Sequence, residues 1–324
     1  MSKKWKKYLL ILIVLLGIGG AFYGYKQANN SASTTSLKTI TIGYQKADPV
    51  DISRQRGDLA KKMKKKGYHV VFKQFQDGTA LMTALKSGNI DYARLGDTPP
   101  ITAQAAGTKL VYIAAGASKE NGTGLVIPKN SSVKSIKDLK GKRVAYTKGT
   151  SSQYLLLSAL KKAGMSASDI KWVNMDQSAA SVAFSKGKVA AWSTWDPYTA
   201  QAEVQMGAKL LITGKNGVSY NRDFVVAMKN FAKKNTDVSS YLTKYLAADM
   251  KWADTHHEKL IKMLMKSLGL SRKVVTKTVE RRSYSMGKVT TKIVKQQQEI
   301  ADMFYASSLI NKDVKVSKIV MSGK

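Results

Sequence analysis

The sequence of 324 residues contains no cysteine, only three histidines and only five prolines. Without cysteine, disulfides, thiol nucleophiles, cysteine-ligated metals and a lipid anchor on an N-terminal cysteine are all excluded. The histidines, His69, His256 and His257, are too few and too poorly spaced for a metal site or a catalytic triad. The low histidine and cysteine content therefore argues against most metalloproteins and many hydrolases.

Catalytic motifs are also missing. The chain has no G-x-S-x-G, no H-E-x-x-H and no phosphate-binding P-loop. Asp91, Asp97 and Asp196 supply carboxylates, but no histidine or paired acid accompanies them for proton transfer. We therefore expect a protein without catalytic residues, bound metal or cofactor.

Positive charge dominates the composition, with 54 Lys and Arg against 21 Asp and Glu, a formal net charge of +33. Clustered basic residues bind nucleic acid, but here the lysines are spread over nearly every segment. No zinc-finger spacing, aromatic RNA-binding strand or basic region before a heptad repeat is present. We expect no nucleic-acid partner, and a basic solvated surface that suits a protein beside an anionic membrane or cell wall.

The N-terminus begins with four lysines, followed by an uncharged run over residues 8–25. A helix of this length comes close to the ~30 Å hydrocarbon core of a bilayer, and its basic flank favours export of the downstream chain. A cleaved signal peptide and an uncleaved anchor both remain open, and the lack of a clean A-x-A site favours the anchor. We expect residues 1–36 to be an apolar helix and tether, and the rest to be extracytoplasmic, at the outer face of the membrane.

Strand and helix patterns alternate from residue 38 onward. Strands are predicted at 38–45, 69–75, 89–96, 110–116, 122–128, 142–149, 170–175 and 188–194, and helices at 77–88, 98–107, 150–164 and 177–187. Residues 230–324 are mostly helical. This alternation predicts an α/β fold with largely parallel sheets.

A weak internal repeat supports two similar α/β halves. Residues 76–92 align with residues 175–191, so that Ala80, Ala84 and Gly88 recur at Ala179, Ala183 and Gly187. Both copies have the pattern strand, helix, glycine, strand, and each precedes a helix with proline at its start. Two tandem halves are the simplest explanation.

Ligands of parallel α/β sheets bind beyond the carboxyl ends of strands, and four loops there are candidates. The residues expected to bind a ligand are Gln45, Asp97, Thr98, Thr150, Ser151, Ser152, Trp195 and Asp196, and the same loops also carry Tyr44, Lys46 and Tyr198. Three of the four loops lead into a helix, and the free backbone amides at a helix N-terminus suit an anion. If the three helix N-termini converge, they could bind an anion in a pocket with neutral walls, without an arginine. Any one of these residues could equally be a helix cap, with Asp196 capping a helix that starts at Pro197. Trp192 lies within a strand and is expected in the core, whereas Trp195 could flank an apolar ligand tail.

These loops occur in stretches that resemble the aliphatic-sulfonate substrate-binding proteins of ABC importers, the family with the taurine and nitrate receptors. The matching stretches include TIGYQKAD, LGDTPPITAQAAG, AYTKGTSSQYLLLSAL and AAWSTWDPY. The resemblance implies a two-lobed, type II periplasmic-binding-protein-like fold with a hinge. Residues 37–118 and 225–324 would form lobe one, and residues 119–224 lobe two.

The resemblance also implies a ligand and partners. Sulfonate oxygens would be held by Gln45, by the helix start after Asp97 and by Thr150, Ser151 and Ser152, with Trp195 against the organic substituent. The protein would be a monomer, anchored through residues 8–25, that delivers its small anion to an ABC permease. Two alternatives stay open: a thiamin-precursor-type enzyme on the same fold, and a surface protein that binds cell-wall or other polyanions.

Overall fold

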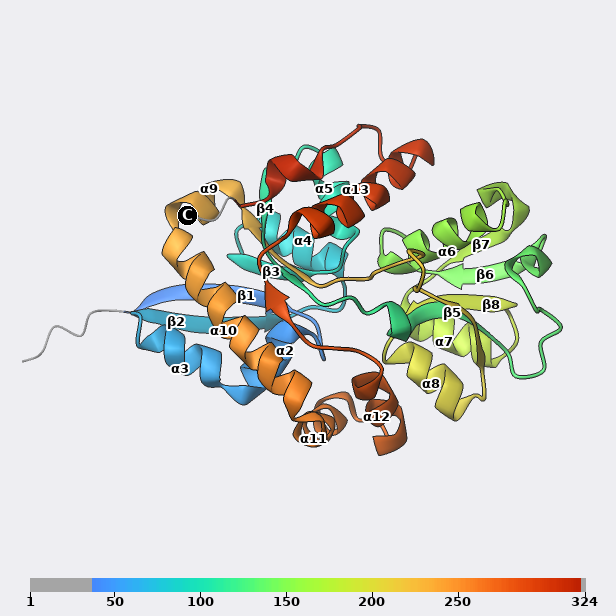
Figure 1. Cartoon of the computed structure of the whole chain (residues 1–324), viewed down its shortest axis with the longest axis horizontal. Coiled ribbons are helices and arrows are strands. Elements are labelled where there is room, and N and C mark those ends of the chain that lie inside the picture. The colour runs from blue at the N-terminus through green and yellow to red at the C-terminus, as the bar shows by residue number, and fades with distance from the viewer. Residues whose placement is uncertain (1–36, 322–324) are drawn as a thin grey trace, which may run out of the picture. The chain divides into compact units, whose positions relative to one another are not determined.

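The computed structural model describes residues 37–321, in which helices pack around two β-sheets (Figure 1). The strands are β1 (Lys38–Tyr44), β2 (Tyr68–Gln74), β3 (Tyr92–Leu95), β4 (Leu110–Gly116), β5 (Thr123–Ile127), β6 (Arg143–Tyr146), β7 (Lys171–Asn174), β8 (Ala191–Trp195), β9 (Lys209–Thr213), β10 (Phe224–Met228) and β11 (Met286–Gly287). The α-helices are α2 (Pro49–Arg56), α3 (Asp58–Lys64), α4 (Gly78–Lys86), α5 (Pro99–Ala105), α6 (Ser151–Lys162), α7 (Gln177–Ser185), α8 (Tyr198–Gln205), α9 (Lys229–Lys234), α10 (Thr236–Thr255), α11 (His257–Leu268), α12 (Arg272–Glu280) and α13 (Thr291–Ala306). Short 3-10 helices are η1 (Glu120–Gly122), η2 (Ile136–Leu139), η3 (Ala167–Asp169) and η4 (Val316–Ile319).

The first sheet has six strands in the order β11-β4-β10-β3-β1-β2. Strand β1 pairs in parallel with β3, whereas β10 runs antiparallel between β3 and β4. Strand β10 comes late in the chain, after all strands of the other sheet, so the chain returns to complete the first sheet. We call this sheet and the helices packed on it the six-stranded half.

The second sheet has five strands in the order β7-β6-β8-β5-β9. Strand β6 is parallel to β7 and β8, and β5 is antiparallel to β8 and β9. With its helices this sheet forms the five-stranded half. The predicted α/β class is confirmed, but the prediction of largely parallel sheets is wrong. Strands β9 and β10 were absent from the prediction, and the direction of β5 depends on pairing that local pattern does not encode.

Each sheet is buried on both faces by helices, because its strands send alternate side chains to opposite sides. In β5, Leu125 and Ile127 enter a core with α6, while Val126 enters a core with α7 and α8. The six-stranded sheet has α2, α3, α10, α11 and α12 over one face and α4, α5 and α13 over the other. Trp192 is fully buried against Phe184 and Tyr198, so the predicted core role of this tryptophan is confirmed.

The internal repeat corresponds to a structural repeat with the same offset of 99 residues. Helix α4 begins at Gly78 and α7 at Gln177, and both start after an aspartate whose carboxylate accepts backbone amides, Asp77 and Asp176. The repeat continues through β3 and β8 and into α5 and α8. As a result, Asp97 and Asp196 occupy equivalent positions before α5 and α8.

The two halves are in contact through more than their connecting chain. Tyr154 and Leu157 of α6 belong to the core that contains Phe304 of α13. The two connecting segments also pair, since the amide of Lys119 donates to Tyr220 O at 2.9 Å and that of Gly116 to Asp223 O at 2.7 Å.

The predicted apolar helix at residues 8–25 lies outside the described residues. Among residues 37–321, no helix is both long and apolar enough to cross a bilayer.

Candidate functional site

Two of the candidate loops meet, although they come from different halves. The hydroxyl of Thr98, before α5, donates to the carbonyl of Gly149, before α6, at 2.9 Å. Thr98 occupies the predicted N-cap position and Pro99 the first helical position, but the Thr98 side chain makes no capping bond. Its hydroxyl bridges the two halves instead, so the fold uses this residue for more than starting a helix.

The start of α6 supplies donors to the same place. Thr150 is the N-cap, and its hydroxyl accepts from the amide of Ser152 at 3.3 Å and donates to Thr147 O at 2.8 Å. Within the described chain, the Ser151 hydroxyl and the amides of Thr150 and Ser151 have no hydrogen-bond partner. Helix α6 has 12 residues, long enough for its dipole to favour a negative charge at this end.

Ser152 has a different environment from Ser151. It is 1% exposed, its hydroxyl donates to Ser193 O at 2.7 Å, and the Ser193 hydroxyl donates back to Ser152 O at 2.7 Å. The amide of Thr147 also donates to the Ser152 hydroxyl at 3.2 Å. This hydroxyl therefore joins α6 to β8 and is less available to a ligand than that of Ser151.

Gln45, just after β1, is held in place by two partners. Its side-chain amide donates to Gln76 O at 2.9 Å, and its side-chain oxygen accepts from Arg94 Nη1 at 2.8 Å. Arg94 is a buried cation in the middle of β3, and its Nε finds no hydrogen-bond partner. The arginine thus connects Gln45 to the strand that leads into Asp97.

Asp97 is an unusual carboxylate, since it is 1% exposed and neither of its side-chain oxygens accepts a hydrogen bond. Burial raises its pKa to about 6, opposed by the ammonium of Lys119, by the nearby backbone amides of Asp97 and Thr98, and by Arg94. The backbone carbonyl of Asp97 accepts a bond from Gln297 of α13. An unpartnered buried group at a loop between two halves indicates a place where a ligand or water completes the bonding.

An ionic cluster centred on the buried Asp223 lies beside Asp97 and joins β3 and the end of α12 to the segments that connect the halves. Asp223 pairs with Arg94, with Lys119 at 2.6 Å and with Arg282 at 3.5 Å. The Nε of Arg282, like that of Arg94, makes no hydrogen bond in the described chain. Burial, and then the neighbouring arginines, lower the pKa of Lys119 well below its usual value.

This cluster contains the residues that sequence reasoning missed. Arg94 is buried and Lys119 and Arg282 are half-buried, and the expectation of neutral walls without arginine did not include these cations near Asp97. Asp48 also faces Arg94, and burial raises its pKa to about 6. One signal was present in the sequence: Arg94 interrupts the otherwise apolar strand Tyr92–Leu95, and such a charge must find partners inside the fold.

The fourth loop is at the end of β8, two residues beyond Ser193. Trp195 is half-buried, and Asp196 is held by Arg281 from the end of α12. The predicted Asp196 cap and Pro197 start are wrong by one residue, since Pro197 is the N-cap and α8 begins at Tyr198. The Asp196 carboxylate still accepts from the amide of Ala200 at 3.1 Å.

Arg281 also binds Glu203 of α8 at 2.6 Å, and Lys277 of α12 binds Glu203 at 3.0 Å. Helix α12 shares the core of the six-stranded half through Val275 and Val279, whereas α8 packs on the five-stranded sheet. These ion pairs therefore connect the two halves at a second place, which we call the α8–α12 latch.

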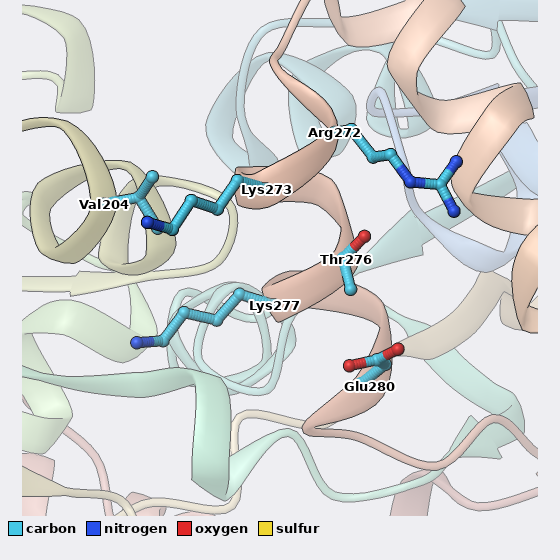
Figure 2. A pocket seen from close by; sticks show the side chains of 6 residues that line it. All are labelled: Val204, Arg272, Lys273, Thr276, Lys277 and Glu280. Atoms are coloured by element: carbon cyan, nitrogen blue, oxygen red, sulfur yellow. The ribbon is translucent and has the colours of Figure 1, made fainter.

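A groove of about 550 Å³ lies over this latch and is separate from the candidate loops. In Figure 2, Lys273 and Lys277 extend from α12 toward α8, where Val204 faces them. Its remaining lining residues are Arg272, Thr276 and Glu280. None of the predicted ligand residues lines this groove.

Metal chemistry finds no support in the described part of the chain, where no group of three or more histidine or acidic side chains could hold an ion. His69 and His256 are exposed on the six-stranded half, and His257 is half-buried beside Tyr284. No histidine is therefore placed for proton transfer at the candidate loops.

Comparison with known proteins identifies similar chains. The NMT1/THI5 like family matches residues 63–259. A protein of Escherichia coli K12 named as an aliphatic sulfonates-binding protein is 34% identical over 289 residues, 88% of this chain and 89% of its own. One of Bacillus subtilis 168 with the same name is 29% identical over 322 residues, 97% of this chain and 94% of its own.

A solved structure is similar over the same range. The alkanesulfonate-binding protein SsuA from Xanthomonas axonopodis pv. citri, bound to MOPS, superposes with a TM-score of 0.82 at 30% identity. The match covers 88% of this chain and 98% of that one. The predicted periplasmic-binding-protein-like fold and the predicted family resemblance are both confirmed.

Proposed function

The chain belongs to the NMT1/THI5-like family, together with the aliphatic sulfonates-binding proteins, and on this premise we propose that it is the extracytoplasmic substrate-binding component of an ABC importer for aliphatic sulfonates. Like the relatives that match most of its length, it is a binding protein and not an enzyme. The observation that carries the proposal is the bond from Thr98 to Gly149, because it brings together two predicted ligand loops from opposite halves.

The sulfonate group sits at the start of α6. The free amides of Thr150 and Ser151 and the Ser151 hydroxyl point donors at one place, and the helix dipole favours the negative charge. The guanidinium groups of Arg94 and Arg282, whose Nε atoms make no hydrogen bond in the described chain, supply charged donors. Gln45 and Thr98 complete the site, whereas Ser152 supports it from behind.

Trp195 covers the organic end of the ligand. It follows directly on the strand that carries Ser193, so its indole is close to the α6 start and half accessible. Asp196, fixed by Arg281, positions this loop and does not contact the sulfonate, which carries the same charge. Micromolar affinity needs about −8 kcal/mol, which several charge-assisted bonds of ~1.5–3 kcal/mol supply after ordering costs.

Closure of two lobes accompanies binding. We assign residues 37–118 and 225–324 to lobe one and residues 119–224 to lobe two, with the paired segments at Lys119 and Tyr220 as the hinge. A ligand that touches both lobes gains contacts only when they approach, so it favours the closed form. The Thr98 bond and the α8–α12 latch are contacts of that closed form, which would dock on the permease as a monomer.

Attachment to the membrane is inferred from the sequence of residues 8–25, which lie outside the described part. We propose that this apolar segment anchors the protein at the outer face of the cell membrane, as its basic flank favours.

The proposal is tested by isothermal titration of ethanesulfonate, butanesulfonate, taurine, sulfate, nitrate and thiamin precursors into the protein. Micromolar binding of one or more sulfonates, with a rise in melting temperature that depends on ligand concentration, is expected. Binding of a thiamin precursor with no sulfonate binding would instead select the enzyme alternative.

A further inference from the structure

The outer side of α3 and the turn after it carry a dense group of lysines. Five lysines lie within six positions of the chain, and all five are exposed: Lys61, Lys62, Lys64, Lys65 and Lys66. None of them forms an ion pair within the described chain. Leu59 and Met63 anchor the helix in the core, so the remaining positions of this short helix are directed outward.

Helix α10 runs beside α3, as Figure 1 shows, and adds two tyrosines to the same surface. The rings of Tyr241 and Tyr245 are stacked, with 6.2 Å between the ring centroids and an angle of 10° between the ring planes. The ammonium of Lys66 lies 5.1 Å from the ring of Tyr241, and that of Lys62 lies 5.7 Å from the ring of Tyr245. Both tyrosines are half-buried, so their edges remain accessible.

Two further exposed lysines lie on this side of α10, because Lys244 follows Tyr241 by three positions and Lys251 follows Lys244 by seven. We call the five lysines of residues 61–66, with Tyr241, Lys244, Tyr245 and Lys251, the α3–α10 basic face.

Three carboxylates near this face, those of Asp58, Asp237 and Asp249, offset only part of its charge. Asp58 pairs with Arg56 at 2.6 Å, and Asp249 is buried between Ser53 and Arg56. Burial raises the pKa of Asp249, and Ser53, Arg56 and, more weakly, Lys62 oppose that rise. Asp237 accepts a bond from the hydroxyl of Tyr68 at 2.9 Å. The ammonium groups consequently repel one another, and an external anionic surface would relieve that repulsion.

The arrangement matches a bilayer better than a small anion. The lysines are spread over two helices, so a single phosphate could meet only one or two of them, whereas a membrane offers many phosphates in one plane. Lysine stems and tyrosine rings also suit the interfacial region, where one end of a side chain is apolar and the other polar.

We propose that the α3–α10 basic face binds the anionic phospholipid surface of a bilayer and so orients the protein on the membrane. This contact is independent of the sulfonate site, because its residues come from α3 and α10 and none of them contacts the loops at Thr98, Ser151 or Trp195. Each lysine near an anionic surface adds to the attraction within about a Debye length.

The test measures co-sedimentation with vesicles. The described residues from Thr39 onward form one compact unit with its own cores, so a chain that begins at Lys38 is used and the apolar segment does not take part. Vesicles of phosphatidylglycerol with phosphatidylcholine are compared with vesicles of phosphatidylcholine alone. The variant replaces Lys61, Lys62, Lys64, Lys65 and Lys66 by Gln, which keeps helix propensity.

The matched control removes the same charge from the five-stranded half. It replaces Lys137, Lys161, Lys171, Lys186 and Lys188 by Gln, all of which are exposed and without an ion pair in the described chain. Circular dichroism and thermal melting show whether both variants are folded. If the variant with five substitutions unfolds, a variant with only Lys64, Lys65 and Lys66 replaced by Gln takes its place. These three lysines follow the buried Met63 at the end of α3.

We expect the parent chain and the control to bind anionic vesicles and not neutral ones, and the α3 variant to bind at least roughly tenfold more weakly. Salt should weaken the binding. Equal losses in variant and control would show that net charge, and not this face, is responsible. Binding to soluble polyglycerol phosphate without binding to vesicles would assign the face to wall polymers and overturn the proposal.

Discussion

The hydroxyl of Thr98 and the carbonyl of Gly149 are joined by a hydrogen bond of 2.9 Å, although one residue precedes a helix of the six-stranded half and the other a helix of the five-stranded half. Thr98 is fully buried, and its hydroxyl serves this bond and not the helix that it starts. The contact exists only when the two halves are together, so its loss should act on ligand binding.

We expect Thr98→Val to weaken ethanesulfonate binding roughly fivefold, since a neutral hydrogen bond contributes about 1 kcal/mol and valine keeps the shape. Isothermal titration measures the effect. The control is Thr102→Val, because the Thr102 hydroxyl bonds to Pro99 O at 3.0 Å within the same helix and makes no bond across the halves. Equal affinities of the two variants would contradict a bridging role for Thr98.

Removal of the Arg281 side-chain charge should destabilise the protein. Arg281 meets both Asp196 and Glu203, whose side chains are only 7% and 14% exposed. Arg281→Gln leaves Asp196 buried without a cation, at a cost of about 3 kcal/mol in the free energy of unfolding. Urea denaturation should show this loss, and the added substitution Asp196→Asn should recover part of it.

The comparison variant is Arg272→Gln, which breaks an exposed pair with Glu258 on α11 and should cost far less. A loss as large as that of Arg281→Gln would mean that any arginine at α12 has the same effect, and that the α8–α12 latch has no special part.

Local sequence signals predicted the elements that depend on local structure. The caps at Asp77 and Thr150 and the glycines after α4 and α7 define helices whose ends the chain encodes within a few residues. The repeat of 99 positions was visible for the same reason. Strand β10 was missed because its place between β3 and β4 depends on pairing with segments more than 100 residues away.

The candidate site likewise has a part that local sequence predicts and a part that only the fold creates. Its helix starts were predictable because Thr150 caps α6 and Pro99 begins α5, and both signals are properties of neighbouring residues. The cations were missed because Lys119 and Arg282 do not stand out in a lysine-rich chain, and only the fold brings them to Asp223. The sequence likewise could not separate Ser151 from Ser152, which differ only in what β8 contributes.

The two serines of the α6 start should therefore respond differently to loss of their hydroxyls. Ser151→Ala should weaken ethanesulfonate binding roughly tenfold, because a charge-assisted bond is lost, and leave the melting temperature unchanged. Ser152→Ala should lower stability by about 1–3 kcal/mol, because Ser193 O and the amide of Thr147 lose their buried partner. Titration and thermal melting of both variants separate the two roles, and a reversed pattern would place the ligand at Ser152.

Asp97 should make the stability of the ligand-free protein fall as the pH rises. Its pKa is raised from 3.8 to about 6 by burial. Between these values the folded protein keeps a proton that the unfolded chain has released, so folding is favoured at low pH and the advantage is lost as the pH rises toward 6 and beyond. Asp97→Asn has no such proton, so its stability relative to the parent chain should rise by about 2 kcal/mol between about pH 4.5 and about pH 7.5.

Urea denaturation at both pH values measures this, with Asp176→Asn, at the exposed cap of α7, as the control. If the difference between Asp97→Asn and the parent is the same at both pH values, Asp97 is not held as a buried acid, and the unpartnered carboxylate beside Thr98 would have to be solvated in solution.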